Sequence, residues 1–147
     1  MAASDIIEII RKALKILNSR LDLKDVLKSD EYLYKQYLAN INNILKITIY
    51  DDNQNFSSIS LAFNPNDDTI VEVPTNTYTH EIIMHEDTFL ALVFDDITPQ
   101  SAYSRGLIVV RGENPHVHAI LLNNVLDRFG KLIDEIKPEI LKQLKLG

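Results

Sequence analysis

Residues 86–112, EDTFLALVFDDITPQSAYSRGLIVVRG, carry most of the structural information in this chain. Two acidic residues precede a short segment that is apolar on two faces, and negative side chains favour the N-terminus of a helix. Pro99 suits the first turn of a second short helix, and Gly106 suits its end. An apolar strand follows from Leu107 to Arg111. The segment therefore predicts two helices and a strand, with an unusual amount of apolar helical surface.

Upstream of this segment, apolar and polar residues alternate as they do in strands. Residues 45–50 alternate in this way and predict a strand with one wet face. The same spacing recurs over residues 58–63, and clusters of Asp, Asn and Pro separate this strand from another over 69–73. A fourth strand is expected at about 79–84. Short polar turns between consecutive strands indicate an antiparallel meander, and the added helices make the class α+β.

Both ends of the chain show helical spacing instead. Apolar residues recur every three or four positions over residues 4–17, and a second helix is expected near Asp30. Another helix is expected over residues 115–125. Gly130 or Pro138 is expected to divide it from a final amphipathic helix, because both residue types interrupt helices.

Composition limits the possible functions. The 147 residues fit one domain that can bury roughly two-thirds of its unfolded surface. The net charge is −6, whereas nucleic-acid phosphates require a concentrated Lys and Arg face, so no nucleic-acid partner is expected. The absence of cysteine excludes disulfides and thiolate chemistry. Charges interrupt the N-terminal helix, which argues against a secretory or membrane-spanning segment there and predicts a cytoplasmic location.

The order of motifs across residues 79–125 is similar to that of a known family. An apolar strand ends in Met and is followed by an acidic residue, a Phe-Leu-x-Leu helix, a Pro-Gln-x-Ala-aromatic helix and a strand bounded by glycines. The matching residues are Met84, Asp87, Phe89, Leu90, Leu92, Pro99, Gln100, Ala102, Tyr103, Gly106 and Gly112. In this order and spacing, the chain resembles the ligand-binding core of the sterol carrier (non-specific lipid-transfer) protein family.

This resemblance implies a fold and a binding site. The implied fold is a five-stranded mixed sheet with helices packed on one face, plus extra helices at both termini. A hydrophobic tunnel between helices and sheet would hold the ligand, and Gln100 would orient its polar end near the mouth. The implied ligand-binding residues are Met84, Phe89, Leu92, Val93, Gln100, Ala102, Tyr103, Ile108, Val110 and Ile120.

The expected organisation is one sterol-carrier-like domain over residues 1–147. It divides into an N-terminal helical extension over 1–42, a core over 43–127 and a C-terminal helix over 128–147. The expected function is non-catalytic binding and transfer of a fatty acid, a fatty acyl-CoA or a similar hydrophobic ligand. The alternative is a ligand-free accessory or dimerisation module of a lipid-related enzyme system. An enzyme is not expected, because no set of acid, base and nucleophile can be assembled from these motifs.

One departure from the family concerns the last strand. The family usually carries Lys at the solvent-facing positions where this chain has Leu107 and Val109. With Ile83 from the neighbouring strand, these residues would form an apolar patch, here called the outer patch, which should not face water. Either the N-terminal helix or a second subunit in a homodimer is expected to cover it. The Lys-rich final helix is expected either to pack as an amphipathic helix or to make transient membrane contact during lipid delivery.

Several residues have less specific interpretations that stay open. The apolar helix containing Phe89 could form an ordinary core, and Gln100 could cap a helix. His80 is expected to be a core histidine. His116 and His118 would lie on different sides of a helix, so no metal site or cofactor is predicted. The acidic pairs fall in predicted turns, where solvated side chains are the usual outcome.

Overall fold

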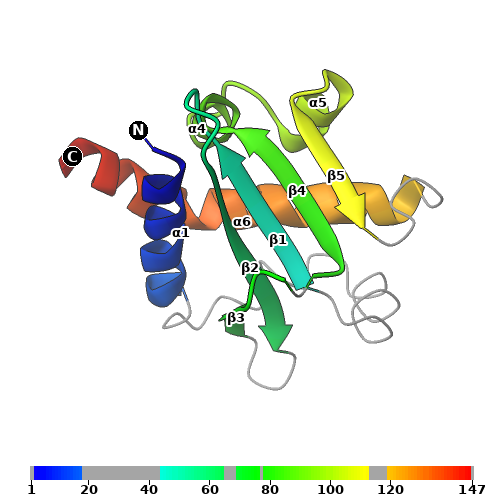
Figure 1. The fold of residues 1–147 in the computed structure, drawn as a ribbon, viewed down its shortest axis with the longest axis horizontal. Coiled ribbons are helices and arrows are strands. Elements are labelled where there is room, and N and C mark those ends of the chain that lie inside the picture. Colours follow the sequence, from blue (N-terminus) through cyan, green and yellow to red (C-terminus); the bar gives the residue numbers. More distant parts are fainter. Residues whose placement is uncertain (1, 18–43, 65–68, 77, 113–118, 147) are drawn as a thin grey trace.

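A computed structural model of the chain describes residues 2–17, 44–64, 69–76, 78–112 and 119–146 (Figure 1). The elements, in chain order, are α1 (Ala3–Leu17), β1 (Ile44–Tyr50), β2 (Phe56–Asn64), β3 (Thr69–Val73), β4 (His80–His85), α4 (Glu86–Val93), α5 (Pro99–Ser104), β5 (Ile108–Gly112) and α6 (Ala119–Leu146). The predicted strands are all present, with the last two displaced by one residue. The helix expected near Asp30 lies outside the described residues.

The five strands form one mixed sheet in the order β3-β2-β1-β4-β5 (Figure 1). β1 pairs antiparallel with β2, β2 with β3, and β4 with β5. β1 and β4 are parallel neighbours at the centre of the sheet. The sheet confirms the predicted α+β class and the five-stranded mixed arrangement.

One face of the sheet forms the floor of the core. Ile47 lies opposite Ile59 on β2 and beside Ile82 on β4, and Ile82 in turn lies opposite Val110 on β5. All four side chains are buried in the main hydrophobic cluster. Cross-strand neighbours of this kind pack side by side and stabilise a sheet. In Figure 1, α6 crosses behind the sheet.

The opposite face is less wet than the alternation over residues 45–50 predicts. Thr48 points to this face and is only 5% exposed. Its hydroxyl donates to Glu81 Oε2 at 2.7 Å and lies 2.8 Å from Ser58 Oγ. Because the single Thr48 proton goes to the carboxylate, Ser58 must be the donor of the second bond. Polar side chains can be buried here because they satisfy one another.

The N-terminal helix is part of the core. Ile6 and Ile10 of α1 are fully buried, and the helix packs against β1, β2 and α6. Arg11 binds Glu72 of β3 through two hydrogen bonds, of 2.7 and 2.8 Å. Since Glu72 pairs with Leu61, its side chain lies on the same face of the sheet as the core. α1 therefore covers the inner face and does not reach the outer patch.

The C-terminal region corrects the predicted helix division. α6 runs without a break from Ala119 to Leu146 and contains both Gly130 and Pro138. Leu126, Phe129, Ile133 and Ile136 are buried at spacings of three and four residues. This continuous apolar stripe packs on α1, α4 and α5, and such packing outweighs the weak helix propensity of the two interrupting residues.

No helix in the described part of the chain is both long enough and apolar enough to cross a membrane.

Candidate functional site

Seven of the ten residues expected to bind ligand come together in the layer between sheet and helices. These buried residues are Met84, Phe89, Leu92, Val93, Ala102, Ile108 and Val110. Tyr103 packs against them and is partly buried, whereas Gln100 is exposed. The side chain of Ile120 lies outside the described residues. The sequence thus identified residues that share one apolar layer, here called the inner layer.

Strand register explains how the sheet contributes to the inner layer. Met84 of β4 lies beside Ile49 of β1 and opposite Ile108 of β5. Parallel pairing of β1 and β4 and antiparallel pairing of β4 and β5 bring these side chains to one face. Side chains two positions further along each strand point to the same face, since strand side chains alternate with a period of two. The result is an apolar floor beneath α4 and α5.

α4 begins directly at the end of β4 and supplies further buried side chains to the inner layer. His85 is its N-cap, and His85 Nδ1 accepts a hydrogen bond from the Asp87 backbone N–H at 3.0 Å. Phe89, Leu92 and Val93 then point into the inner layer. The second apolar face expected for this helix is only partly buried: Leu90 packs against the core, whereas Phe94, which follows the end of the helix at Val93, is 53% exposed.

α5 closes the layer between α4 and β5. The Thr98 hydroxyl caps α5 by accepting from the Ser101 backbone N–H at 3.1 Å, and Pro99 occupies the first turn as predicted. Gly106, with φ of 74°, follows the helix and turns the chain into β5. Ala102 is fully buried, so α5 approaches the core closely at that position.

A hollow of about 310 Å³ lies where α4, α5 and α6 meet. It is lined by Leu92, Asp95, Ile97, Thr98, Pro99, Gln100, Gly130, Ile133 and Asp134. This volume is near the lower end of the range for small-molecule pockets, roughly 300–1,000 Å³. Two of the predicted ligand-binding residues, Leu92 and Gln100, contribute to its lining. Below, "the hollow" means this site.

Two contacts connect α6 to the other segments that surround the hollow. Lys137 of α6 forms an ion pair with Asp95, which follows α4. Gly130 faces Pro99, and a Cβ atom added at Gly130 would lie 3.2 Å from Pro99 Cγ. α6 can therefore approach α5 closely because Gly130 has no side chain. The ion pair and the close approach together fix α6 against both short helices.

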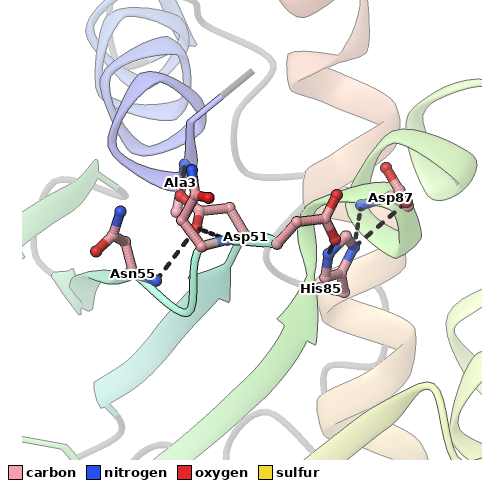
Figure 2. A network of polar contacts seen from close by, with 7 residues as sticks. Ala3, Asp51, Asn55, His85 and Asp87 are labelled. Carbon is pink, nitrogen blue, oxygen red and sulfur yellow. Dashed lines mark hydrogen bonds and ion pairs between the residues drawn. The ribbon is translucent and has the colours of Figure 1, made fainter.

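A polar network ties the β1–β2 turn to the start of α1 (Figure 2). Asp51 Oδ2 accepts from the Ala3 backbone N–H at 3.2 Å, and Oδ1 accepts from Asn53 and Asn55 at 3.0 and 3.1 Å. These donors, led by Ala3, hold the pKa of the Asp51 carboxyl below its usual value, and nearby His85 lowers it further. The sequence predicted only a solvated turn at this position.

Next to this network lies a cluster with metal-ligand chemistry. Asp52, His85 and Glu86 each offer one ligand atom, and these atoms lie within 4.8 Å of one another. No sequence pattern indicates this grouping, because 33 residues separate Asp52 from His85 and only the β1–β4 pairing joins them.

Phe129 and Leu126 are core residues that the sequence interpretation missed. Leu126 directly follows the helix expected over residues 115–125, and Phe129 lies at the start of the C-terminal helix expected over 128–147, but neither was singled out as a core residue. Their spacing to Ile133 and Ile136 continues the same helical stripe, so the apolar period itself is the signal that could have identified them. Phe129 and Phe89 are among the largest fully buried side chains in the described residues.

The combination of sheet order, inner layer and helix placement defines the sterol carrier protein 2 class of fold. No protein-family profile matches the sequence, and no curated protein sequence matches it. Among solved structures, the chain is similar to apo sterol carrier protein 2 from Yarrowia lipolytica, with a TM-score of 0.58 and 15% identity over 92% of this chain and 91% of that one. This likeness confirms the resemblance: the chain has the fold of a sterol carrier protein 2-like domain.

Two further structures are similar. A conserved hypothetical protein from Thermus thermophilus gives a TM-score of 0.50 and 14% identity, covering 80% of this chain and 82% of that one. A protein described as UbiJ-SCP2, a ubiquinone synthesis protein, gives a TM-score of 0.48 and 14% identity, covering 87% and 95%. At these identities, the likeness to the Yarrowia lipolytica and Thermus thermophilus structures establishes the fold alone.

Proposed function

We propose that this protein binds and transfers a hydrophobic ligand with a long apolar chain, without covalent chemistry. The carrying observation is that a sterol carrier protein 2-like fold coincides with a hollow lined by Leu92 and Gln100, two residues that the sequence had already singled out. The ligand's polar end would lie at the hollow beside Gln100. Its apolar chain would extend into the inner layer, in a tunnel between the sheet and α4, α5 and α6.

The proposed binding residues are those expected from the sequence. The chain of the ligand would contact Met84, Phe89, Leu92, Val93, Ala102, Tyr103, Ile108, Val110 and Ile120. Because those of these side chains that the structure describes are packed together, entry would require α5 and α6 to separate. The seam where Pro99 meets Gly130 is the proposed line of opening, since it borders the hollow and carries no interlocking side chain on the α6 side.

The energetics favour such binding. Burial of a methylene group gains about 0.8 kcal/mol, so a sixteen-carbon chain gains on the order of 12 kcal/mol before costs. Loss of motional freedom and ordering of the ligand subtract several kcal/mol. The balance corresponds to roughly micromolar to nanomolar affinity. Fatty acids and acyl thioesters both carry suitable chains, and little polar recognition is needed.

The accessory-module alternative is not favoured, because the described residues combine a sterol carrier protein 2-like fold with a hollow beside Gln100. Exchange of ligand with a membrane would be transient, and a cytoplasmic location belongs to the same proposal. The direct test is titration of delipidated protein with a fluorescent long-chain fatty acid and with an uncharged analogue of equal length. Saturable binding of either at one molecule per chain supports the proposal; no saturable binding of either rejects it.

A further inference from the structure

A second site, separate from the hollow, lies at the opposite end of α4 from Asp95. The parallel pairing of β1 and β4 places Tyr50 beside His85. Asp52 follows Tyr50 by two residues, and Glu86 follows His85 directly. Consequently the β1–β2 turn and the β4–α4 junction bring one imidazole and two carboxylates together, with ligand atoms within 4.8 Å of one another.

Glu86, one of the three cluster residues, carries a buried oxygen atom whose hydrogen-bonding capacity is unused among the described residues. The residue is 8% exposed, and its Oε2 atom is buried without a hydrogen-bond donor among the residues that the structure describes. Among the described residues, Ser60 Oγ is the other buried side-chain atom in that condition. A buried carboxylate oxygen without a donor is costly, more so than a hydroxyl, because its charge loses hydration. A cation would provide the missing partner.

His85 lies between the carboxylates of Asp52 and Asp87, and in this structure its Nδ1 atom accepts from the Asp87 backbone N–H. Its Nε2 atom lies 2.8 Å from Asp52 Oδ1, and its Nδ1 atom lies 3.5 Å from Asp87 Oδ2. A ligating histidine usually donates its other ring N–H to a carboxylate. When a cation replaces the proton on Nε2, the neutral ring carries its proton on Nδ1, and Asp87 Oδ2 is then the acceptor. In that tautomer, Nδ1 no longer accepts the hydrogen bond from the Asp87 backbone N–H.

We propose that Asp52, His85 and Glu86 bind a divalent first-row transition cation of the Zn²⁺ type. An imidazole suits Zn²⁺ and its neighbours, whereas Mg²⁺ and Ca²⁺ prefer sites made entirely of oxygen. Asp51 and Asp87 add negative charge around the three ligands. Three protein ligands leave at least one position to water. The bound cation joins the β1–β2 turn to the first residue of α4, the helix that supplies Phe89 to the inner layer.

The site is tested in a His116→Ala/His118→Ala background, because those two histidines could also bind Zn²⁺. His85→Asn removes Nε2 but keeps a side-chain acceptor at the N-cap, a position that favours Asn. Glu86→Gln removes the buried charge. Asp96→Asn is the control, since Asp96 is an exposed acid outside the cluster. Each variant is titrated with Zn²⁺ by calorimetry and with Co²⁺ by visible absorption.

We expect one Co²⁺ per chain with a visible ligand-field band, and an increase in Tm on addition of Zn²⁺. His85→Asn and Glu86→Gln should each weaken binding by roughly tenfold or more, the scale of loss for removing even an outer-shell partner. Asp96→Asn should bind like the background protein. No Zn²⁺ binding, equal binding by the two cluster variants and the background, or tighter binding of Mg²⁺ than of Zn²⁺ would overturn the proposal.

Measuring Tm in the absence of metal distinguishes a metal-ligating role of Glu86 from a purely structural role. In chelator, Glu86→Gln should melt no lower than the background protein, because a neutral amide is easier to bury than an unpartnered carboxylate. The Zn²⁺-dependent rise in Tm should disappear in the same variant. A Glu86→Gln protein that loses equal stability with and without Zn²⁺ would assign Glu86 a structural role and contradict the proposal.

Discussion

Asp51 and Ala3 are 48 residues apart in the sequence, yet the Asp51 carboxylate accepts the Ala3 backbone N–H at 3.2 Å (Figure 2). The first N–H groups of a helix have no partner within the helix. Asp51 supplies one from the β1–β2 turn and adds a negative charge where a helix N-terminus favours it. The contact fixes α1 over the sheet, where Ile6 and Ile10 complete the core.

The Asp51 contact predicts a pH dependence. The pKa of Asp51 is lowered in the folded protein, chiefly by the Ala3 N–H. Its contribution to stability is therefore full above the unfolded pKa, about 3.9, and is lost as pH falls through the lower folded value. Asp51→Asn should lower Tm at neutral pH and should flatten the fall of Tm below about pH 4.

Asp96→Asn is the matched control for this measurement, because Asp96 is an exposed acid in another turn. It should leave both Tm and its pH dependence close to those of the unmodified protein. If Asp51→Asn retained the full acid-induced fall in Tm, the assigned role of Asp51 would be wrong.

The position of Gln100 predicts where ligand enters. Gln100 is exposed and lines the hollow, whereas Ser104 lies on the same short helix, is also exposed and does not line it. Gln100→Trp should obstruct the hollow without entering the core, and should slow lipid binding in stopped-flow fluorescence. Ser104→Trp should bind at the original rate. Equal rates for the two variants would place the mouth elsewhere.

The charge at the hollow predicts a preference among polar head groups. Asp95 and Asp134 line it, no basic residue does among those described, and the nearby Lys137 is already paired with Asp95. At equal chain length, an uncharged alcohol should therefore bind more tightly than a fatty acid anion. Asp134→Asn should raise fatty acid affinity by a small factor, since exposed charges are screened beyond about 8 Å at physiological salt.

The alcohol serves as the internal control in that comparison. Its affinity should not change in Asp134→Asn, because it carries no charge for Asp134 to repel. An anion that binds the unmodified protein more tightly than the alcohol does, with no effect of salt, would contradict the predicted preference.

The outer patch leads to a prediction about association. Leu107 and Val109 are 42% and 47% exposed, so α1 does not cover them, and that part of the expectation is wrong. Cover by a second subunit stays a prediction. Replacing both with lysine should convert a dimer into a monomer in analytical ultracentrifugation without lowering Tm of the monomer. An unchanged mass for the lysine variant would show that the patch is not an interface.

Much of the fold follows from local pattern. The alternation around Ile47 and Ile59 locates two strands, because a half-buried sheet imposes a period of two. Pro99 and Gly106 bound α5 as their backbone preferences require. The division expected at Gly130 or Pro138 is wrong because the apolar stripe through Phe129 continues across both residues, and its packing outweighs their weak helix propensity.

The candidate sites likewise contain some residues that the sequence could identify and others that it could not. Phe89 and Leu92 were identifiable as residues of the inner layer, because helical spacing and a family motif coincide at these positions. The Asp51 contact with Ala3 and the grouping of Asp52 with His85 depend on long-range strand pairing and chain reversal, so neither leaves a local pattern. A buried polar contact between distant residues is visible only when the sheet order is known.

The central claim is that the inner layer accepts an apolar chain. Native mass spectrometry of freshly purified protein tests it most directly, with lipid extraction of the same sample to identify any bound molecule. The account predicts a species heavier than the chain by the mass of one lipid, which disappears on delipidation and returns when a long-chain ligand is added. A protein that shows only the bare chain mass before delipidation and after addition of such ligands would contradict it.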